Sequence, residues 1–365
     1  MENNSPAFSV LKVIGSILIV LVVIVALGVG LLTILEYKPA PEEPIEPIHA
    51  AKGKDSISTD DELTIMTWNM GYCGLSETAD FFMDGGKSVV TQDEDSVKNN
   101  LLNIERIVAE NDPDVVYLQE IDKDSTRSFG INQVKDFTEN AFPDNSSSYA
   151  TNFKVLFIPY PIPPIGHMDC GILTSSKYDI AESTRVSLPC PFSWPVRTMN
   201  LKRCLDISRV PVKDSDREFV FINLHLEAYD DGEGKIAQTR QLAEIMQAEY
   251  DKGNYVIAGG DFNQTFSSVD TSMYPPRGEE LWQCGIIDES QFGDNFSFVM
   301  DNSNPSCRSL DRAYDSSDPN FQVYLIDGFI VSDNLKVDSV ETLDYGFKYT
   351  DHNPVKMTVS FKNEK

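Results

Sequence analysis

The strongest constraint on this chain is an uncharged run near its N-terminus, residues 13–35, built mainly from Val, Ile, Leu and Gly. At about 1.5 Å of helical rise per residue, such a run spans a hydrocarbon layer roughly 30 Å thick. A cleaved signal peptide is the alternative, but its apolar core would be only about 7–15 residues long and would precede a small-residue cleavage site. Because Ile34-Leu35-Glu36 makes a poor cleavage site, we expect a transmembrane helix over 13–35.

Charges on either side of this run predict its orientation. Lys12 and the N-terminal amine precede it, whereas Glu42, Glu43 and Glu46 follow it. The positive-inside tendency then predicts a short cytoplasmic N-terminus, residues 1–12, and a single-pass protein of the cell membrane whose remaining chain is extracellular. The opposite orientation stays open, because a single lysine supports this prediction.

A proline-rich acidic segment separates the apolar run from the rest of the chain. Residues 39–47 read PAPEEPIEP, a composition typical of an extended, semi-rigid spacer. The polar character continues to Asp61, so we expect a linker over 36–61 and a folded domain over 62–365. A chain of 365 residues that is 41% apolar can build one large domain with its own core.

Net charge and cysteine spacing narrow the classes of partner. A net charge of −27 repels a nucleic-acid backbone, so it disfavours a general nuclease, although a local basic groove stays open. None of the six cysteines stands in a CxxC pair, which disfavours a structural zinc site. Cys190 and Cys204 are candidates for a disulfide outside the cell, with free thiols as the alternative.

Short apolar runs alternate with helical patterns from Leu63 onward. Helices are expected over 97–110 and 235–250, where apolar residues recur at helical spacing. Strands are expected at 63–68, 115–118, 155–158, 171–174, 203–210, 219–224, 255–258, 323–331 and 355–360. Many strands with few helices predict a layered α/β or α+β fold, and the pattern alone leaves the topology open.

Polar side chains recur where these predicted strands end, which is where layered folds place their sites. In chain order they are Asn69, Glu120, His225, Asp261, Asn263, Asp327, Asp351 and His352. Each alone has a structural interpretation, as a turn residue, an ion pair or a core histidine. Two of the chain's four histidines belong to this set, and that concentration favours chemistry.

Seven collinear segments around these residues resemble the endonuclease/exonuclease/phosphatase superfamily, which includes pancreatic-type deoxyribonucleases, abasic-site endonucleases, neutral sphingomyelinases and inositol polyphosphate 5-phosphatases. The segments are TWNMG at 67–71, DVVYLQE at 114–120, CGILTSSKY at 170–178, INLHLEA at 222–228, IAGGDFNQ at 257–264, IDGFIVS at 326–332 and TDHNPV at 350–355. The resemblance covers about 63–361 and implies a four-layer α/β sandwich, in which two mixed sheets pack together with helices outside.

The same resemblance implies metal-dependent hydrolysis of a phosphodiester or phosphomonoester. Glu120 can supply a hard oxygen ligand, helped by the amide oxygen of Asn69 and by Asp351. This oxygen-rich set suits Mg²⁺, or alternatively Mn²⁺, better than zinc.

The remaining residues of the set would carry out the chemistry. By resemblance, His352 would bind a phosphoryl oxygen or activate water, with Asp327 fixing its tautomer. Asp261 would orient or deprotonate the attacking water, and Asn263 would donate to the phosphoryl oxygens. His225 would stabilise the phosphate or serve the leaving group. Whether Asp261 or His352 is the base stays open.

Two segments depart from the resemblance. The insert 75–95 is expected to form a flap over the site. Residues 153–168 are apolar and proline-rich, and are expected to form a substrate-facing rim or else an unusual loop. His167 and Tyr72 are candidate substrate contacts.

The acidic charge and the tether favour a small or lipid-linked phosphoester as substrate. An extracellular nuclease and a non-catalytic binding domain are the alternatives, and no protein partner is implied.

Overall fold

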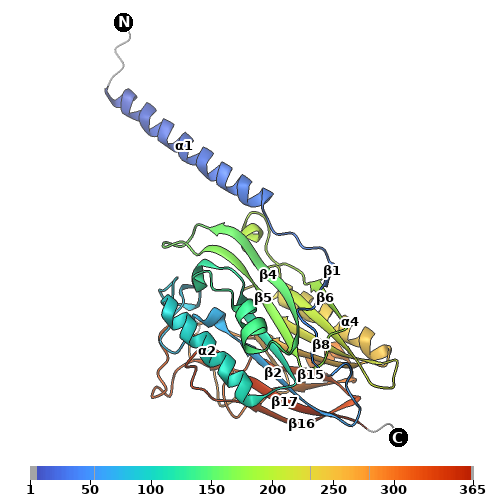
Figure 1. The fold of residues 1–365 in the computed structure, drawn as a ribbon. Helices are drawn as coiled ribbons and strands as arrows, with labels where there is room; N and C mark the ends of the chain where they lie inside the picture. Colours follow the sequence, from blue (N-terminus) through green and yellow to red (C-terminus); the bar gives the residue numbers. More distant parts are fainter. Residues whose placement is uncertain (1–5, 53, 231, 279, 363–365) are drawn as a thin grey trace.

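The computed structural model describes residues 6–362 except 53, 231 and 279, and one long helix stands apart from the folded domain (Figure 1). This helix, α1 (Pro6–Ile34), covers the predicted apolar run and begins before it. Its span Val10–Ile34 is long and apolar enough to cross a membrane, and none of the span is buried, although a signal sequence would satisfy the same criteria. The predicted cytoplasmic segment 1–12 lies partly outside the described residues.

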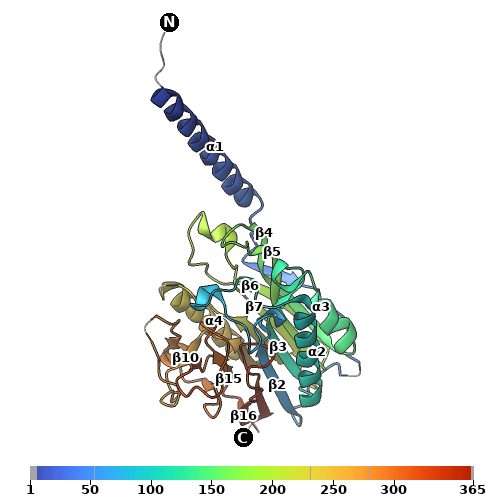
Figure 2. The same cartoon turned by 90° about the vertical axis from the view of Figure 1, so that its left-hand side faces the viewer.

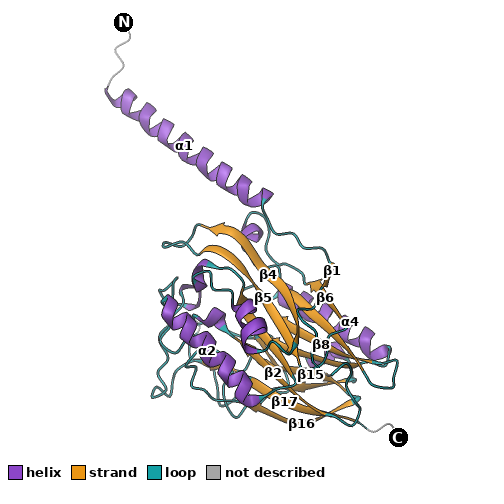
Figure 3. Ribbon diagram, viewed as in Figure 1, coloured by secondary structure: helices purple, strands orange, loops and turns teal. Residues whose placement is uncertain are grey.

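Two mixed sheets form the centre of the domain (Figure 3). Among the described residues, one sheet has seven strands in the order β1 (Glu42–Ile45), β6 (Glu182–Ser187), β7 (Cys204–Pro211), β8 (Glu218–His225), β9 (Tyr255–Asp261), β15 (Asp327–Ser332) and β12 (Phe296–Val299). The other has six, in the order β16 (Leu335–Thr342), β17 (Val355–Phe361), β2 (Glu62–Asn69), β3 (Val115–Asp122), β5 (Gly166–Ser176) and β4 (Ser146–Ile158). The predicted sandwich of two packed mixed sheets is confirmed.

The central strands are apolar on both faces because both faces are covered. In β2, Leu63 and Ile65 point into the core between the sheets, while Met66 and Trp68 point outward. The alternation follows from the two-residue period of a strand. Phe219 and Phe221 of β8 face the same inner core from the other sheet.

Helix α2 (Glu94–Asn111) covers the outer face of the six-stranded sheet (Figures 1 and 3). Asp93 caps its first turn by accepting a hydrogen bond from the Ser96 backbone N–H at 2.8 Å. The buried face of the helix carries Leu101 and Ile104, which pack in one cluster with the outward side chains of β2 and β3. The predicted helix 97–110 is therefore confirmed and extended by a turn.

Helix α4 (Glu233–Asp251) covers the outer face of the seven-stranded sheet, which completes the four layers (Figure 3). Leu242 and Met246 are buried against the outward side chains of β8 and β9. Ile236, which the sequence pattern assigned to the apolar face, is instead exposed.

Shorter elements connect these layers. They are the strands β10 (Gln264–Phe266), β11 (Gly285–Ile287), β13 (Cys307–Arg308) and β14 (Val323–Tyr324), the helix α3 (Gln133–Lys135), and the short helical turns η1 (Gly71–Cys73), η2 (Phe82–Asp84), η3 (Thr126–Ser128), η4 (Asp136–Ala141), η5 (Val196–Met199) and η6 (Glu289–Phe292). The predicted strand 323–331 is two strands, β14 and β15, because the chain leaves one sheet and joins another between them.

The proline-rich segment after α1 is not a free spacer. Glu42–Ile45 pairs antiparallel with β6 as the edge strand of the seven-stranded sheet. Glu36 lies 3.3 Å from both Arg197 and Lys202, and only 2% of its side chain is exposed. An extended proline-containing segment suits a sheet edge, where backbone N–H groups need no further strand. The expected linker 36–61 is therefore attached to the domain almost from the end of α1.

Candidate active site

Three of the selected polar residues meet at the ends of neighbouring strands in the seven-stranded sheet. β8 and β9 are parallel and in register, so His225 lies beside Asp261. β15 runs antiparallel to β9 and begins with Asp327 directly opposite Asp261. The sheet therefore brings together side chains that are 36 and 66 residues apart along the chain.

The six-stranded sheet contributes Asn69 and Glu120 from the parallel strands β2 and β3. The pairing of β3 with β5 shifts register between Leu118 and Ile121, and Glu120 within this bulge has a positive φ of 51°. Positive φ is uncommon for a residue with a side chain, and bulges re-aim side chains next to sites. This distortion accompanies the placement of the Glu120 carboxylate in the cavity.

Asn69 connects the two sheets. Its Nδ2 donates to Asp261 Oδ2 at 2.9 Å and to Glu120 Oε1 at 3.3 Å, while its Oδ1 accepts from the Gly71 backbone N–H at 2.9 Å. The amide oxygen is therefore committed to the backbone, and the amide nitrogen holds the two carboxylates in place. The expected role of Asn69 as a metal ligand stays a prediction.

Asp261 lies at the centre of the cluster. Its Oδ2 is 3.5 Å from His225 Nε2 and 3.7 Å from His352 Nε2, and its Oδ1 accepts from the Asn263 backbone N–H at 2.8 Å. Asn263 has a φ of 51°, and its side-chain Nδ2 donates to the Leu226 carbonyl at 2.9 Å. The turn after β9 is thereby tied to the turn after β8.

His352 is held from both sides. Its Nδ1 lies 2.9 Å from Asp327 Oδ2, the contact that the family resemblance implies, and its backbone carbonyl accepts from Trp68 Nε1 at 2.9 Å. The neighbouring Asp351 accepts from Thr350 Oγ1 at 3.1 Å. With Nδ1 engaged, His352 presents Nε2 to the centre of the site.

Burial and mutual charge separate the pKa values of these groups. Burial raises the pKa of Asp261 most, Asp327 adds to this rise and His352 opposes it. The resulting pKa is about 7. Burial lowers the pKa of His352, but Asp327, Cys307 and Asp351 outweigh it and hold this pKa well above its usual value. Burial and Arg203 keep the pKa of His225 well below its usual range. The pKa values of the two imidazoles are therefore shifted in opposite directions.

A cavity of about 270 Å³ opens over these residues. The candidate site residues that line it are Tyr72, Glu120, His225, Asp261, Asn263, Asp351 and His352. The insert 75–95 contributes Phe81, Met83 and Asp84 to the lining. Asp84 accepts a hydrogen bond from the Tyr229 hydroxyl at 3.1 Å, so the insert closes over the site as expected of a flap.

The two candidate substrate contacts differ. Tyr72 is buried in the cavity wall, and the guanidinium of Arg127 stacks 3.8 Å from the centre of its ring. His167 does not line the cavity, and its Nε2 lies 3.5 Å from Asp124 instead. Because His167 lies on β5 next to the cavity-lining Met168, strand alternation turns its side chain to the opposite face. His167 therefore lies outside the cavity lining, and its expected role as a substrate contact stays a prediction.

Three arginines in the cavity wall, Arg127, Arg203 and Arg308, were not selected from the sequence. Arg127 contacts Asp122 at 3.0 Å and Glu120 at 3.4 Å. Arg203 pairs with Glu227 at 3.2 Å and donates to the His225 carbonyl at 3.1 Å. Arginines in loops or at strand ends carry no pattern of their own, whereas Glu227 lies two residues after His225 within the INLHLEA segment and was within reach of sequence reasoning.

The two glycines before Asp261 lie inside a strand and not in a turn. Gly259 and Gly260 lie inside β9, paired on both sides. A Cβ on Gly259 would lie 2.5 Å from the Phe329 ring, and one on Gly260 would lie 2.0 Å from the Leu224 carbonyl oxygen. Gly260 also has a φ of 148°. Close approach of neighbouring strands, and not a turn, requires glycine here.

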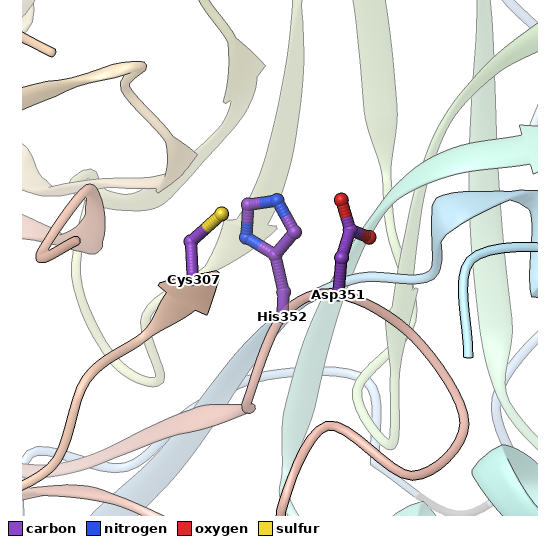
Figure 4. A group of neighbouring side chains, drawn as sticks. All are labelled: Cys307, Asp351 and His352. Atoms are coloured by element: carbon purple, nitrogen blue, oxygen red, sulfur yellow. The ribbon is translucent and has the colours of Figure 1, made fainter. Parts of the chain in front are cut away.

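The available donors fit a hard cation better than zinc. Figure 4 shows the His352 ring between the Cys307 sulfur and the Asp351 carboxylate, and donor atoms of these three lie within 4.8 Å of one another. Burial raises the pKa of the Cys307 thiol to about 12, so this sulfur is protonated when no metal is bound. The carboxylates of Glu120 and Asp351 are instead hard oxygen donors of the kind that Mg²⁺ prefers.

Three buried polar atoms in the site lack a hydrogen-bond partner among the described residues, namely His225 Nδ1, Asp327 Oδ1 and Arg308 Nε. Buried polar atoms are normally paired, so such exceptions mark a place for a ligand or water.

The candidate disulfide between Cys190 and Cys204 is not formed, and all six cysteines are free. Cys204 is buried on β7, whereas Cys190 is exposed in the preceding loop.

The sequence model described as "Endonuclease/Exonuclease/phosphatase family" matches residues 66–352, which is most of the chain and includes every residue of the cluster. The chain belongs to this family. Members of the endonuclease/exonuclease/phosphatase family are hydrolases that act on phosphoester bonds, typically with divalent metals. No curated protein sequence matches the chain.

Solved structures of the endonuclease/exonuclease/phosphatase fold resemble this chain at low identity. An endonuclease/exonuclease/phosphatase from Beutenbergia cavernae DSM 12333 has a TM-score of 0.56 and 16% identity, over 83% of this chain and 72% of that one. A functionally unknown conserved protein from Enterococcus faecalis V583 has a TM-score of 0.52 and 14% identity, over 82% and 100%. The human Nocturnin catalytic domain with a bound sulfate anion has a TM-score of 0.50 and 14% identity, over 87% and 97%. At these identities the likeness shows the shared fold alone.

Proposed function

We propose that this protein is a membrane-anchored, Mg²⁺-dependent phosphoesterase that hydrolyses a small or lipid-linked phosphoester. The observation that carries the proposal is the convergence on Asp261, whose Oδ2 lies within 3.7 Å of Asn69, His225 and His352. These residues come from both sheets and lie on four different segments of the chain. Packing alone does not require buried carboxylates and imidazoles in one place, because burying such groups lowers stability.

A divalent cation would be held by Glu120 and Asp351, with Asn69 positioning Glu120 through its amide nitrogen. When bound, the cation would neutralise charge on the phosphoryl oxygens and support the leaving group. Mg²⁺ is the proposed ion because the donors are oxygens, and Mn²⁺ would suit the same set.

The protein's own residues supply the remaining functions. Asp261 would orient the attacking water and take its proton, since its carboxylate is central and its pKa is close to neutral. His352, which is held by Asp327 and whose pKa is raised, would face the phosphoryl oxygens as negative charge builds. His225 would stabilise the scissile phosphate or serve the leaving group, and Asn263 would donate to a phosphoryl oxygen.

The character of the cavity supports a small or lipid-linked substrate over duplex DNA. The arginines that line the cavity are Arg127, Arg203 and Arg308. Arg127 and Arg203 are paired with carboxylates, and Arg308 donates to backbone carbonyls. Much of the remaining wall is apolar and includes the side chains of Leu75, Ile158, Met168 and Ile326. A duplex binder needs uncompensated positive charge along the backbone path.

The activity is tested with the full chain in detergent micelles. Mg²⁺ should support hydrolysis of bis-p-nitrophenyl phosphate, sphingomyelin or phosphatidylcholine, and EDTA should abolish it. Plasmid cutting alone would favour a nuclease. If no substrate were turned over with Mg²⁺ or Mn²⁺, the remaining interpretation would be a non-catalytic binding domain.

The cell-membrane location and extracellular orientation are part of the proposal. Protease added to intact cells should release a fragment beginning after α1 if the domain faces outward. Protection in intact cells, with cleavage only after permeabilisation, would place the domain inside.

A further inference from the structure

The end of α1 packs directly on the wall of the active-site cavity. Leu32, in the last turn of the helix, packs against a cluster formed by Val155, Ile158 and Met168. Ile158 and Met168 also line the cavity. The catalytic cavity and the apolar helix are therefore separated by a single layer of side chains.

The orientation of the helix against this wall is fixed by polar contacts. Trp194 Nε1 donates to Thr33 Oγ1 at 3.0 Å. One turn further on, buried Glu36 lies 3.3 Å from both Arg197 and Lys202. At about 1.5 Å of rise per residue, Leu32 and Thr33 lie within about 3 Å of the helix end. Groups that contact them therefore lie at the level where the membrane span ends.

Large apolar side chains are exposed at the same level. They lie at the end of β4 and on its connection to β5, and on η5 and the segment leading into it, and both β4 and η5 contact α1. We call them the tip surface: Leu156, Phe157, Tyr160, Ile162, Trp194 and Val196. Ile162 is 91% exposed and Tyr160 is 75% exposed. Figure 2 shows these segments on the side of the domain from which α1 leaves.

The position of the tip surface beside α1 indicates that a membrane covers it. A contiguous exposed apolar patch marks a contact with a protein or a membrane. Here the patch lies on and beside β4 and η5, which contact a helix whose length and composition suit a bilayer. Trp and Tyr, both present in the patch, are enriched at membrane–water interfaces.

The cavity wall next to the tip surface is apolar as well. Phe153, Ile165 and Met199 line the cavity and pack on the same cluster as Leu32. Glu120, Asp351, His225 and His352 line the same cavity. One cavity thus joins an apolar wall beside the membrane span to the proposed hydrolytic groups.

We propose that the tip surface is immersed in the bilayer interface around α1, and that the cavity takes an amphiphilic phosphoester directly from that bilayer. The phosphate would reach Asp261 and His352, while the hydrocarbon part would lie along Phe153, Ile158 and Met168. The substrate class is a membrane lipid with a phosphoester headgroup. This inference rests on the proposed phosphoesterase activity for its substrate, but not for the membrane contact.

Substrate selectivity tests the lipid assignment. The full chain is placed in phosphatidylcholine/phosphatidylglycerol vesicles with Mg²⁺, and hydrolysis of vesicle lipids, with sphingomyelin added in a parallel preparation, is compared with that of soluble bis-p-nitrophenyl phosphate. The double variant Phe157→Ser/Ile162→Ser should lose at least about tenfold in lipid turnover while the soluble substrate changes less than twofold. The matched control Met273→Ser/Ile286→Ser changes residues that are 67% and 68% exposed elsewhere and should retain both rates.

Two outcomes would overturn the lipid assignment. In one, the tip variant keeps its lipid rate or loses both rates equally. In the other, the wild type hydrolyses the soluble diester but no vesicle lipid. If the wild type hydrolyses neither, the proposed function itself fails, which is a distinguishable result.

Membrane contact is tested without activity. On a Trp194→Phe background, Ile162→Trp should be quenched by brominated phosphatidylcholine at least twofold more than Ile286→Trp on the same background. Equal quenching of the two variants would overturn the immersion of the tip surface.

Discussion

The two ends of β8 and β9 carry buried side chains of opposite character, aromatic at one end and polar at the other. At their first residues, Phe219 stacks on Phe221 with ring centres 4.6 Å apart, and Tyr255 meets Phe361 edge-on at 4.7 Å. At their last residues, His225 and Asp261 are equally buried but polar. The same pair of strands thus carries packing that stabilises the fold at one end and groups that lower stability at the other.

This difference separates residues that hold the domain together from those that act on a substrate. Aromatic burial contributes a few kcal/mol per side chain. Buried ionisable groups lower stability unless they are paired, and proteins retain them mainly where function needs them. Substitutions at the two ends should therefore have opposite consequences for activity and stability.

The largest expected effect is on catalysis. Asp261→Asn should lower kcat by roughly 10³-fold, or about 4 kcal/mol in the barrier, because it removes the central carboxylate. Thermal stability should stay equal or rise, since burial already raises the pKa of this carboxyl to about 7. Steady-state rates and melting curves of the full chain in detergent would show this, with exposed Asp270→Asn as the control. Activity within a few-fold of wild type would contradict the assignment of Asp261.

The next effect is on stability at the opposite end of the strands. Phe219→Ala should cost about 3–5 kcal/mol, because the side chain is fully buried in the inner core. That corresponds to a fall in Tm on the order of 10 °C. The kcat of the remaining folded protein, measured well below Tm, should change less than twofold. A large loss of kcat without a fall in Tm would show that the two ends are not separable.

An ion pair near the same end should show a defined pH dependence. Burial raises the pKa of Glu249, but hydrogen bonds from Arg209, Lys252 and Asn254 outweigh it and lower the pKa to about 2. Because this pKa is lower in the folded state, ionised Glu249 stabilises the protein at pH values above the unfolded pKa of about 4.3. That stabilisation is lost as the pH falls toward 2.

Glu249→Gln should therefore cost about 1–3 kcal/mol at pH 7, with the difference shrinking below about pH 4. Melting curves between pH 7 and pH 3 measure it. Glu218→Gln, the more exposed partner of Arg209, should cost less than about 1 kcal/mol. A difference that stays constant down to pH 3 would contradict the role assigned to this ion pair.

The smallest effect concerns closure of the cavity at the polar end. Tyr229→Phe removes the hydrogen bond to Asp84 that links the flap to the loop after β8. A single partly exposed hydrogen bond contributes about 1 kcal/mol, so KM should rise about two- to fivefold with kcat and Tm almost unchanged. A rise in KM with no change for Tyr274→Phe, a distant half-buried tyrosine, would assign the effect to the flap. An unchanged KM would mean that the bond does not hold the flap.

Most of the strands and both amphipathic helices were predictable because their apolar residues repeat at the period of the element that buries them. Edge strands such as β1 and β16 were not, because a partly solvated edge carries mixed and polar residues. The polar set at the strand ends was predictable as well, since carboxylates and imidazoles interrupt apolar strands there. Arg127 and Arg203 were not, because a surface arginine and a cavity arginine look the same in sequence.

The sequence by itself determined that an apolar helix precedes one layered domain, and which polar residues stand at strand ends. Hydrophobic periodicity and local motifs carry that information within short windows. Only the tertiary structure decided that Asn69 bridges two sheets through its amide nitrogen, that His167 faces away, and that residues 42–45 join the sheet. It also placed the end of α1 against the cavity wall. These outcomes depend on strand order, register and bulges, which arise from contacts between residues tens to hundreds of positions apart.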